Sequence, residues 1–435
     1  MVYFFRVMPI GSLKLHNILR AIKKDKRWII LIALFLFFVF LRFYQLEEKS
    51  IFLYDQLDSA WAAKNIIDDH RFPLIGPANK LGSGLFVGPL YYYLIAIFYY
   101  FTNLDPIASG LFAGATSIIG FFVLFYITKK LFSFNVALIA LFIATVSYSG
   151  IQFDRVQWEI NFIPIVSLLA FYFLYKILNG NEKSIVWLAI IVALTFHVHL
   201  TVAIFIPIII ILTLPFFPIN KKTLKYILVS IPILFIGLSP VIVANLQSNN
   251  HHGANAINYA NATFHGISLT RILQLKDGAF FQLESFLTLG ILRFLRIVLL
   301  PIFLFVYLRN TASKKRFAMT GMVSLWFLVP WIVLSGYSGE ITDYYFSTNR
   351  YIGIFLIAYL VVKLLEQKKF IITSALAIFS VYYSIVNLST FFNSKAMGLS
   401  VRKNSVRQTI EQKKVIPFKE GNAESYIYYF YTRKK

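Results

Sequence analysis

The chain has 435 residues, of which 58% are hydrophobic and 14% are charged, and its formal net charge is +23. A soluble protein of this size would carry about a quarter charged residues, and the absence of cysteine excludes disulfides, thiolate metal sites and thiol catalysis. The basic residues form short clusters between apolar segments, which argues against a nucleic-acid-binding groove.

Apolar segments near the length that crosses a ~30 Å hydrocarbon core recur along most of the sequence. The basic segment 1–27 has no small-residue cleavage site after it, so we expect a cytoplasmic N-terminus followed by an uncleaved anchor. Residues 28–390 are predicted to form an all-α polytopic transmembrane domain, with a small tail at 391–435. The eleven predicted spans are 28–44, 107–128, 131–150, 160–178, 185–198, 200–218, 224–244, 284–308, 317–336, 349–366 and 370–390.

The short apolar segment 89–102 is rich in tyrosine, which is favoured at membrane interfaces. If it crossed the membrane, every later basic cluster would fall outside, against the positive-inside rule. We therefore expect the first outer loop, 45–106, to contain interfacial helices instead of a span. The same topology places the tail outside, although Arg402 and Lys403 conflict with the rule. A re-entrant segment that returns the tail to the cytoplasm is the alternative.

Charged residues gather at the predicted outer mouths of the helices. Six of them are singled out as candidate site residues: Asp55, Asp58, Asp154, Arg155, Glu159 and Arg350. Such a grouping suggests a cavity that handles a charged substrate. Asp55 could instead be only the N-cap of a surface helix that runs to about Asp69. His197 and His199 lie at a span boundary, where we expect local hydrogen bonds and not a metal.

Several motifs occur in a characteristic order. A basic N-terminus and one span lead to an acidic motif (YDQLD), then GPLYYYL, ITKKLF, FDRVQWE and a late STNRYIGIFLIAYL. In this order the motifs resemble the GT-C superfamily of lipid-phosphate-sugar glycosyltransferases. Within it they resemble bacterial relatives of protein O-mannosyltransferases and the lipid A aminoarabinose transferase. The resemblance covers roughly residues 28–390 and implies a GT-C-like bundle in the cell membrane.

The resemblance implies that the acid at the head of the first outer loop, Asp55, is the catalytic base. The family often has two adjacent acids, whereas this chain has Asp55-Gln56 and a second acid at Asp58, so Asp58 is a rival for this role. A carboxylate here takes the proton of an acceptor hydroxyl. One base and one leaving group predict a single displacement with inversion, unlike the close carboxylate pair of a retaining enzyme.

The departing phosphate needs fixed positive charge, which the planar fork of arginine suits. The resemblance maps the late family arginine to Arg350, and the acid of the second outer loop to Asp154, with Arg155 beside it. We predict that Arg155 and Arg350 bind the phosphate. Hydroxyls of the sugar or the acceptor are assigned to Asp58, Asp154 and Glu159. These carboxylates could hold a divalent cation, but we expect no cofactor.

The expected partners are a polyprenyl-phosphate-linked sugar donor, membrane lipids and a protein, lipid or glycan acceptor, on the extracytoplasmic side. Two other classes stay open. An O-antigen ligase or polymerase would usually have a large late outer loop, and the late loop here, 245–283, is sizeable but poor in arginine. A transporter of lipid-linked saccharides would show inverted repeats and broken spans in matching positions, and the sequence shows no such symmetry.

Overall fold

A computed structural model describes residues 25–78, 85–218, 220–247, 252–283, 293–311, 313–394, 398–419 and 421–433. In these ranges the chain is almost entirely helical. Two isolated antiparallel bridges, Ala78–Phe86 and Phe264–Tyr337, are the β-type pairings among these residues. The predicted cytoplasmic segment 1–27 lies mostly outside the described residues.

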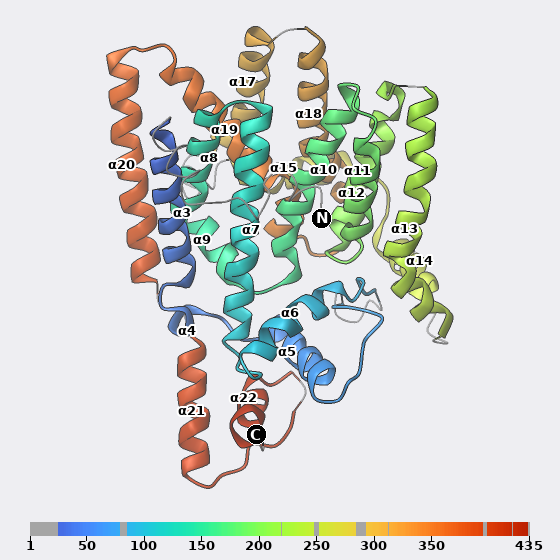
Figure 1. The fold of residues 1–435 in the computed structure, drawn as a ribbon, viewed down its shortest axis with the longest axis vertical. Coiled ribbons are helices and arrows are strands. Elements are labelled where there is room, and N and C mark those ends of the chain that lie inside the picture. The colour runs from blue at the N-terminus through green and yellow to red at the C-terminus, as the bar shows by residue number, and fades with distance from the viewer. Residues whose placement is uncertain are drawn as a thin grey trace.

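Figure 1 shows the helices in two tiers, a bundle and a smaller group beneath it. The bundle contains α3 (Arg27–Phe43), α7 (Ala108–Leu131), α8 (Phe134–Val146), α9 (Tyr148–Arg155), η2 (Glu159–Phe162), α10 (Ile163–Leu178), α11 (Ser184–Thr195), α12 (Leu200–Thr213), η3 (Leu214–Phe216), α13 (Lys221–Gln247), α14 (His252–Thr263), α15 (Leu269–Ala279), α17 (Leu295–Asn310), α18 (Ser313–Ser335), η4 (Asp343–Asn349), α19 (Arg350–Leu365) and α20 (Phe370–Asn393). The lower tier contains α4 (Leu46–Lys49), α5 (Tyr54–Ile67), α6 (Leu90–Phe101), α21 (Leu399–Glu411) and α22 (Ala423–Thr432).

The bundle has the character of a multi-pass membrane protein. Each of the eleven predicted spans contains a described helix. By length and composition, six described helices could cross a membrane, or seven if the bent pair α8–α9 counts as one span, so the number eleven is not confirmed. Shorter spans such as α11, with 12 residues, do not reach the full width alone. A 70° bend separates α8 from α9, the short helix that contains Asp154 and Arg155.

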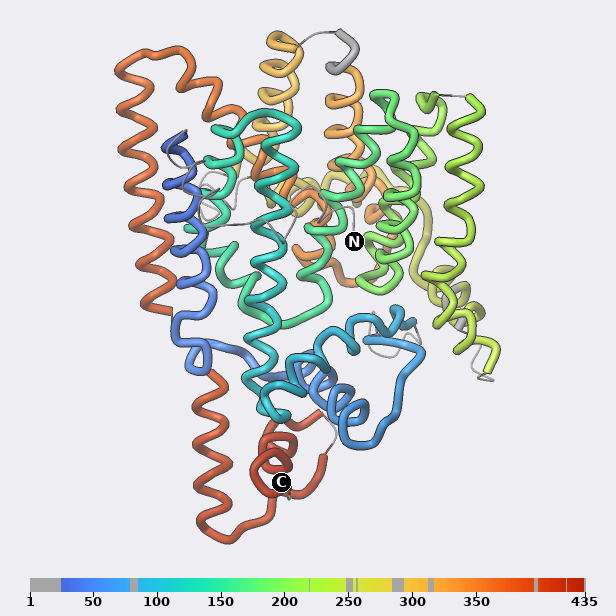
Figure 2. Tube along the Cα trace, viewed as in Figure 1, coloured from blue at the N-terminus to red at the C-terminus, as the bar shows by residue number. Residues whose placement is uncertain are grey.

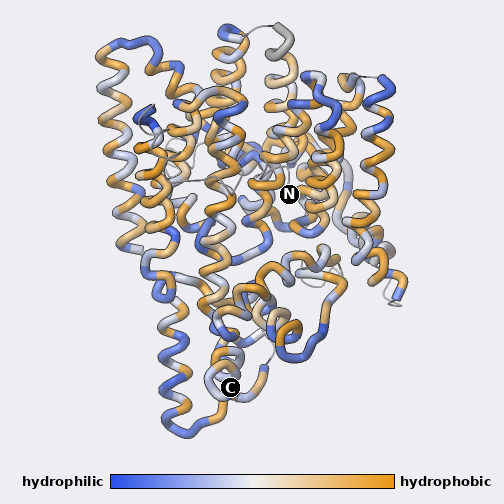
Figure 3. Tube along the Cα trace, in the orientation of Figure 1, coloured by the Kyte–Doolittle hydropathy of each residue, from blue (hydrophilic) through white to orange (hydrophobic). Residues whose placement is uncertain are grey.

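The chain runs up and down the bundle in the predicted alternation. In Figure 2 the tube descends through α3, α8, α11, α13, α18 and α20, and rises through α7, α10, α12, α17 and α19. The connections with basic clusters therefore lie at the upper end, where Figure 3 shows hydrophilic stretches above a mostly hydrophobic bundle. The predicted outer loops lie at the opposite end, beside the lower tier.

The first outer loop folds into the helices of the lower tier. The segment 89–102 forms α6, which has 12 residues. This helix packs on α5 and α7 and does not cross the bundle. Leu57 of α5, Tyr91 and Ile95 of α6, and Tyr426 of α22 share one buried core. Burying an apolar side chain of this size contributes about 1.5–3 kcal/mol, so this core holds the loop and the tail together.

The tail docks on the first outer loop, and its location on the outer side of the membrane stays a prediction. Lys403 of α21 is almost fully buried and forms ion pairs with Glu47 at 2.5 Å and with Asp105 at 2.7 Å. At Gly398, just before α21, an added Cβ would lie only 1.7 Å from the carbonyl oxygen of Glu48. Glycine is therefore needed for the tail to approach α4 so closely.

We expect Lys403→Met to loosen the tail, because the substitution leaves Glu47 and Asp105 without their cation. The expected loss of stability is about 1–3 kcal/mol. Burial alone would lower the pKa of Lys403, but hydrogen bonds to Asp105 and Glu47 outweigh it and raise the pKa. The stabilisation that comes from the charged ammonium group is therefore lost only as the pH rises through this raised pKa, above the ordinary value of 10.5. Thermal unfolding and limited proteolysis between α20 and α21 measure the effect, and Lys414→Met, at an exposed site, should change neither.

Candidate active site

Asp55 and Asp58 lie at the head of α5. The helix begins at Tyr54, and the side chain of Gln56 accepts a hydrogen bond from the backbone N–H of Leu53 at 3.1 Å. This side chain closes the helix N-terminus. Asp55 is the second residue of the helix and not its N-cap, so the alternative that Asp55 merely caps the helix is wrong. Asp58 follows three positions later and therefore shares its face of the helix.

Asp55, Asp58 and Glu159 form a group that we call the acidic cluster. Glu159 begins η2 and lies close enough to both aspartates to interact with them electrostatically. The hydroxyl of Tyr92 donates a hydrogen bond to Asp58 Oδ2 at 2.5 Å. Both aspartates reach solvent, but nearby protein removes part of the water around Asp55. This burial, together with the negative charge of Asp58, raises the pKa of Asp55 above its ordinary value of 3.8.

Two buried glutamines dock α5 onto the second outer loop. Gln56 Nε2 donates to the carbonyl oxygen of Gln157 at 2.5 Å. The side chain of Gln157 donates to Ser59 Oγ at 3.1 Å and to the hydroxyl of Tyr91. These bonds bring together two loops that are about 100 residues apart in the sequence, which is how the acidic cluster assembles. The sequence analysis missed both glutamines and noted Gln56 only as a departure from an acidic pair.

A buried arginine, Arg42 near the end of α3, is the partner of Asp154. Its guanidinium donates to Asp154 Oδ2 from Nη2 at 2.6 Å and from Nε at 3.0 Å. It also donates to the carbonyl oxygens of Ala144 and Thr145, each at 2.8 Å. The structure thus gives Asp154 a positioning role, while its contact with a hydroxyl stays a prediction. Arg42 was missed, although an arginine within an apolar segment is itself a sign of function.

The guanidinium of Arg155 forms hydrogen bonds with backbone carbonyl groups at and just after the end of α3. Nη1 donates to the carbonyl oxygens of Leu41 and Arg42 at 2.9 and 2.8 Å, and Nη2 donates to that of Gln45 at 3.3 Å. The carbonyls of Leu41 and Arg42 lie at the negative end of the α3 dipole and lack partners within that helix, whereas the carbonyl of Gln45 also accepts a hydrogen bond from the backbone N–H of Lys49. Arg155 is only 3% exposed. It therefore fixes the corner between α3 and α9, while its predicted contact with a phosphate stays a prediction.

Arg350 opens α19 as predicted and is also buried. It donates to the carbonyl oxygen of Ser149 at 3.1 Å and to Gln282 Oε1 at 3.4 Å. Its guanidinium carbon lies 4.2 Å from the centre of the Phe153 ring. A cavity of about 10 Å³ borders Arg350 and Asp154, which is room for one water molecule. A phosphate therefore fits beside Arg350 only if neighbouring side chains move.

Arg42, Arg155 and Arg350 form a second group around Asp154, which we call the basic cluster. Three guanidinium groups against one carboxylate leave an excess of two positive charges in a buried region. The end of α3 offsets part of this charge. The backbone from Arg155 to Glu159 spans at most about 14 Å, so the basic and acidic clusters are neighbours at one mouth of the bundle.

Part of the sequence matches a known family. Residues 87–246 match the profile of the dolichyl-phosphate-mannose-protein mannosyltransferase family. The matched range includes Asp154 and Glu159 but begins after Asp55 and Asp58. No curated protein matches the chain in sequence.

Two solved structures share the arrangement of helices. ArnT from Cupriavidus metallidurans bound to undecaprenyl phosphate is similar with a TM-score of 0.57 and 11% identity, over 93% of this chain and 75% of ArnT. The archaeal oligosaccharyltransferase AglB from Archaeoglobus fulgidus, in complex with an inhibitory peptide and a dolichol-phosphate, has a TM-score of 0.56 and 13% identity. That match covers 94% of this chain and 60% of AglB. Both are GT-C glycosyltransferases. The chain has the GT-C fold.

Within this GT-C fold each of the two histidines has a hydrogen-bond partner. His197 Nε2 lies 2.7 Å from the carbonyl oxygen of Gly237, and His199 Nδ1 lies 2.9 Å from Thr201 Oγ1 at the start of α12. The contact of His199 is local, as the sequence analysis expected, whereas that of His197 reaches α13, 40 residues away. Among the described residues, no group of three or more histidines and carboxylates is arranged to hold a metal ion. The absence of a cofactor stays a prediction.

Proposed function

We propose that this GT-C protein is a glycosyltransferase that moves a sugar from a polyprenyl-phosphate-linked donor to a hydroxyl acceptor. The observation that carries the proposal is the pairing of an acidic and a basic cluster at one mouth of the bundle. A sugar phosphate needs both, because the attacking hydroxyl loses a proton and the leaving phosphate gains charge. The fold supports the proposal, since solved examples hold undecaprenyl phosphate or a dolichol-phosphate.

Asp55 is assigned as the general base. It takes the proton of the acceptor hydroxyl while the hydroxyl oxygen forms a bond to the anomeric carbon. The bond from that carbon to the phosphate oxygen breaks at the same time, and the polyprenyl phosphate leaves with the electron pair. A single displacement of this kind inverts the anomeric configuration. Asp58 and Glu159, which flank the base, are assigned to hydroxyl groups of the sugar or the acceptor.

The basic cluster is assigned to the phosphate. Its excess positive charge lies where water is largely excluded, so it stabilises negative charge on the leaving group more strongly than in water. Arg350 is the proposed ligand once neighbouring side chains move. Arg155 and Asp154 act as positioning residues that keep the arginines in place. This assignment requires no divalent cation.

The proposed site faces the outside of the cell membrane. The connections with basic residues lie at the end of the bundle opposite the acidic cluster. By the positive-inside rule those connections are cytoplasmic. This supports an extracytoplasmic active site, where a lipid-linked sugar is available without a nucleotide.

The direct test is donor breakdown by the purified protein in lipid nanodiscs, with a panel of labelled polyprenyl-phosphate sugars and nucleotide sugars. We expect release of polyprenyl phosphate from at least one lipid-linked donor, unchanged by EDTA. Turnover of nucleotide sugars alone would contradict the proposal. Movement of intact lipid-linked sugar across vesicles without bond cleavage would favour a transporter instead.

Asp58→Asn is expected to move the acidic limb of the pH–rate profile to lower pH. The base works when deprotonated, so the rate rises as the pH increases through the pKa of Asp55. Since burial and the charge of Asp58 raise that pKa, removing the charge lowers it. Profiles of kcat/KM for both proteins measure the shift. Complete loss of turnover at every pH would instead identify Asp58 as the base.

A further inference from the structure

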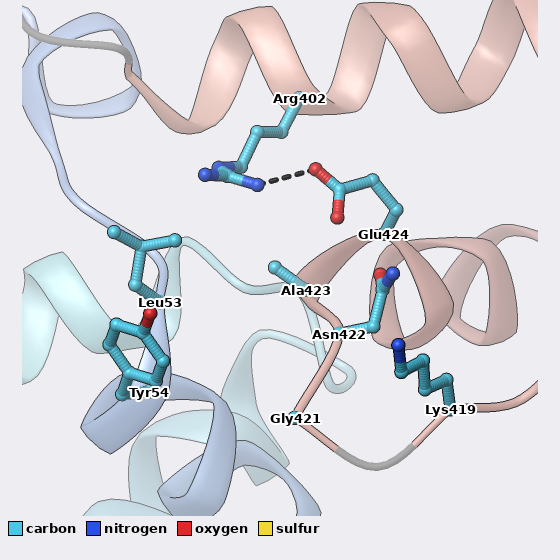
Figure 4. Close-up of a pocket in the computed structure, with 8 residues that line it drawn as sticks. All are labelled: Leu53, Tyr54, Arg402, Lys419, Gly421, Asn422, Ala423 and Glu424. Carbon is cyan, nitrogen blue, oxygen red and sulfur yellow. Dashed lines mark hydrogen bonds and ion pairs between the residues drawn. The ribbon is translucent and has the colours of Figure 1, made fainter.

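A polar cavity lies between the head of α5 and the C-terminal helices (Figure 4). Its volume is about 240 Å³, just below the roughly 300–1,000 Å³ of drug-sized ligand sites, so it admits one small unit. Tyr54 lines one side, and Arg402, Lys419, Asn422 and Glu424 line the other. We call it the tail pocket. It forms only because the tail is docked on the first outer loop.

The tail pocket lies on the side of α5 that faces away from the membrane bundle. Gln56 and Ser59 contact the second outer loop from the bundle side. In Figure 1 α22 lies beneath α5, farther from the bundle. A donor held by its lipid approaches from the bundle, whereas a water-soluble acceptor approaches from below. Tyr54, which is 74% exposed, directly precedes the proposed base Asp55.

The charges of the tail pocket favour an anionic ligand. Arg402 forms an ion pair with Glu424, so these two charges offset each other. The ammonium group of Lys419 then gives the lining of the tail pocket a net positive charge. The buried Nε of Arg402 has no hydrogen-bond partner among the described residues. Exposed basic residues continue along the tail at Arg407 and Lys414. A carboxylate or phosphate group is therefore attracted to this surface.

The other side chains favour a sugar ring over a simple anion. The exposed ring of Tyr54 offers an apolar face for the C–H groups of a sugar, and Asn422, Arg402 and Glu424 are planar groups that hydrogen-bond to hydroxyls. A small number of polar groups around an aromatic surface is the usual composition of a specific ligand site.

We propose that the tail pocket binds an acidic sugar unit of the acceptor glycan, bearing a carboxylate or a phosphate, and so brings an acceptor hydroxyl to Asp55. This inference rests on the proposed function, because it names the acceptor of that reaction. Lys419 binds the anionic group and Tyr54 packs on the sugar ring. The tail is then the part of the chain that selects the acceptor.

The test measures binding of glucuronate, glucose 6-phosphate and glucose to the full-length protein in nanodiscs by saturation-transfer NMR titration. We expect a sugar acid to bind more tightly than glucose, and the stronger of the two acids identifies carboxylate or phosphate. Lys419→Glu should weaken this binding at least about tenfold, since a charge-assisted contact is replaced by repulsion. Lys414→Glu makes the same charge change at an exposed site outside the pocket and should leave binding unchanged.

A second variant distinguishes recognition of the sugar ring from recognition of the anionic group. Tyr54→Ala should weaken binding of the sugar acid but not of inorganic phosphate. If Lys419→Glu and Lys414→Glu weakened binding of the sugar acid equally, the tail pocket would not be the binding site. If a short polyglutamate peptide bound as tightly as the sugar acid, the ligand would not be an acidic sugar. Binding of the sugar acid can be measured without turnover, and donor breakdown can be measured without a ligand in the tail pocket. Absence of donor breakdown therefore contradicts the proposed function, whereas Lys419-independent binding contradicts this inference alone.

Discussion

The Asp55→Asn protein is expected to lose turnover by about 10²–10⁴-fold while staying folded, because the change removes the proposed general base and keeps its shape. Within the described residues the Asp55 carboxylate forms no hydrogen bond or ion pair that the fold would lose. Its pKa is raised by burial and by Asp58, so the charged carboxylate is disfavoured in the folded protein.

The raised pKa of Asp55 also predicts how Asp55→Asn changes the thermal stability of the protein. A raised pKa means that ionised Asp55 opposes folding once the pH exceeds that pKa, so asparagine should leave the melting temperature at neutral pH unchanged or slightly higher. Donor breakdown and thermal unfolding are measured on the same preparation. Retained turnover in Asp55→Asn, with loss in Asp58→Asn, would move the base to Asp58. A protein that lost activity only by unfolding would leave Asp55 as a structural residue.

Features that follow from local sequence could be predicted. The length of each apolar segment places a helix in every predicted span, and the basic clusters set the alternation of the loops. The tyrosine-rich segment 89–102, which the basic clusters excluded from the spans, forms α6 in the lower tier. The predicted number of eleven spans is not confirmed, because described helices such as α11 end after 12 residues.

Features that depend on distant contacts could not be predicted. Gln56 and Gln157 are 101 residues apart and Arg42 and Asp154 are 112 apart, and neither pair lies in a local motif. Asp154 could be singled out from the sequence, and Arg42 could have been, but nothing in the sequence indicates which residue is the partner of each. For Arg155 a phosphate contact was predicted, but the contacts of its guanidinium with the carbonyl groups at the end of α3 could not be.

The contacts of the tail could not be predicted from the sequence either. Its basic composition conflicted with an outer location, and no motif indicated a partner. The structure explains part of the conflict, because Lys403 is neutralised by Glu47 and Asp105 and Arg402 is paired with Glu424. Basic residues that are paired within the protein do not report on membrane orientation as free charges do.

Breaking the buried pair of Arg42 and Asp154 should cause the largest loss of stability in the molecule. Asp154→Leu leaves the Arg42 guanidinium, which is fully buried, without its carboxylate. Removing one partner of a buried ion pair typically costs about 3–5 kcal/mol. We expect strongly reduced folded yield and a lower melting temperature in nanodiscs. Lys363→Leu, which breaks an exposed pair with Glu366, should cost at most about 1 kcal/mol.

The double variant Arg42→Met/Asp154→Leu separates stability from substrate contact. It removes one positive and one negative charge together, so the excess of two positive charges in the basic cluster stays the same and much of the lost stability should return. Recovery is incomplete because Arg42 also donates to the carbonyl oxygens of Ala144 and Thr145, each worth about 1 kcal/mol. If Asp154 only positions Arg42, turnover recovers along with the melting temperature. If Asp154 binds a sugar or acceptor hydroxyl, the double variant folds but its turnover stays low, with an increased KM.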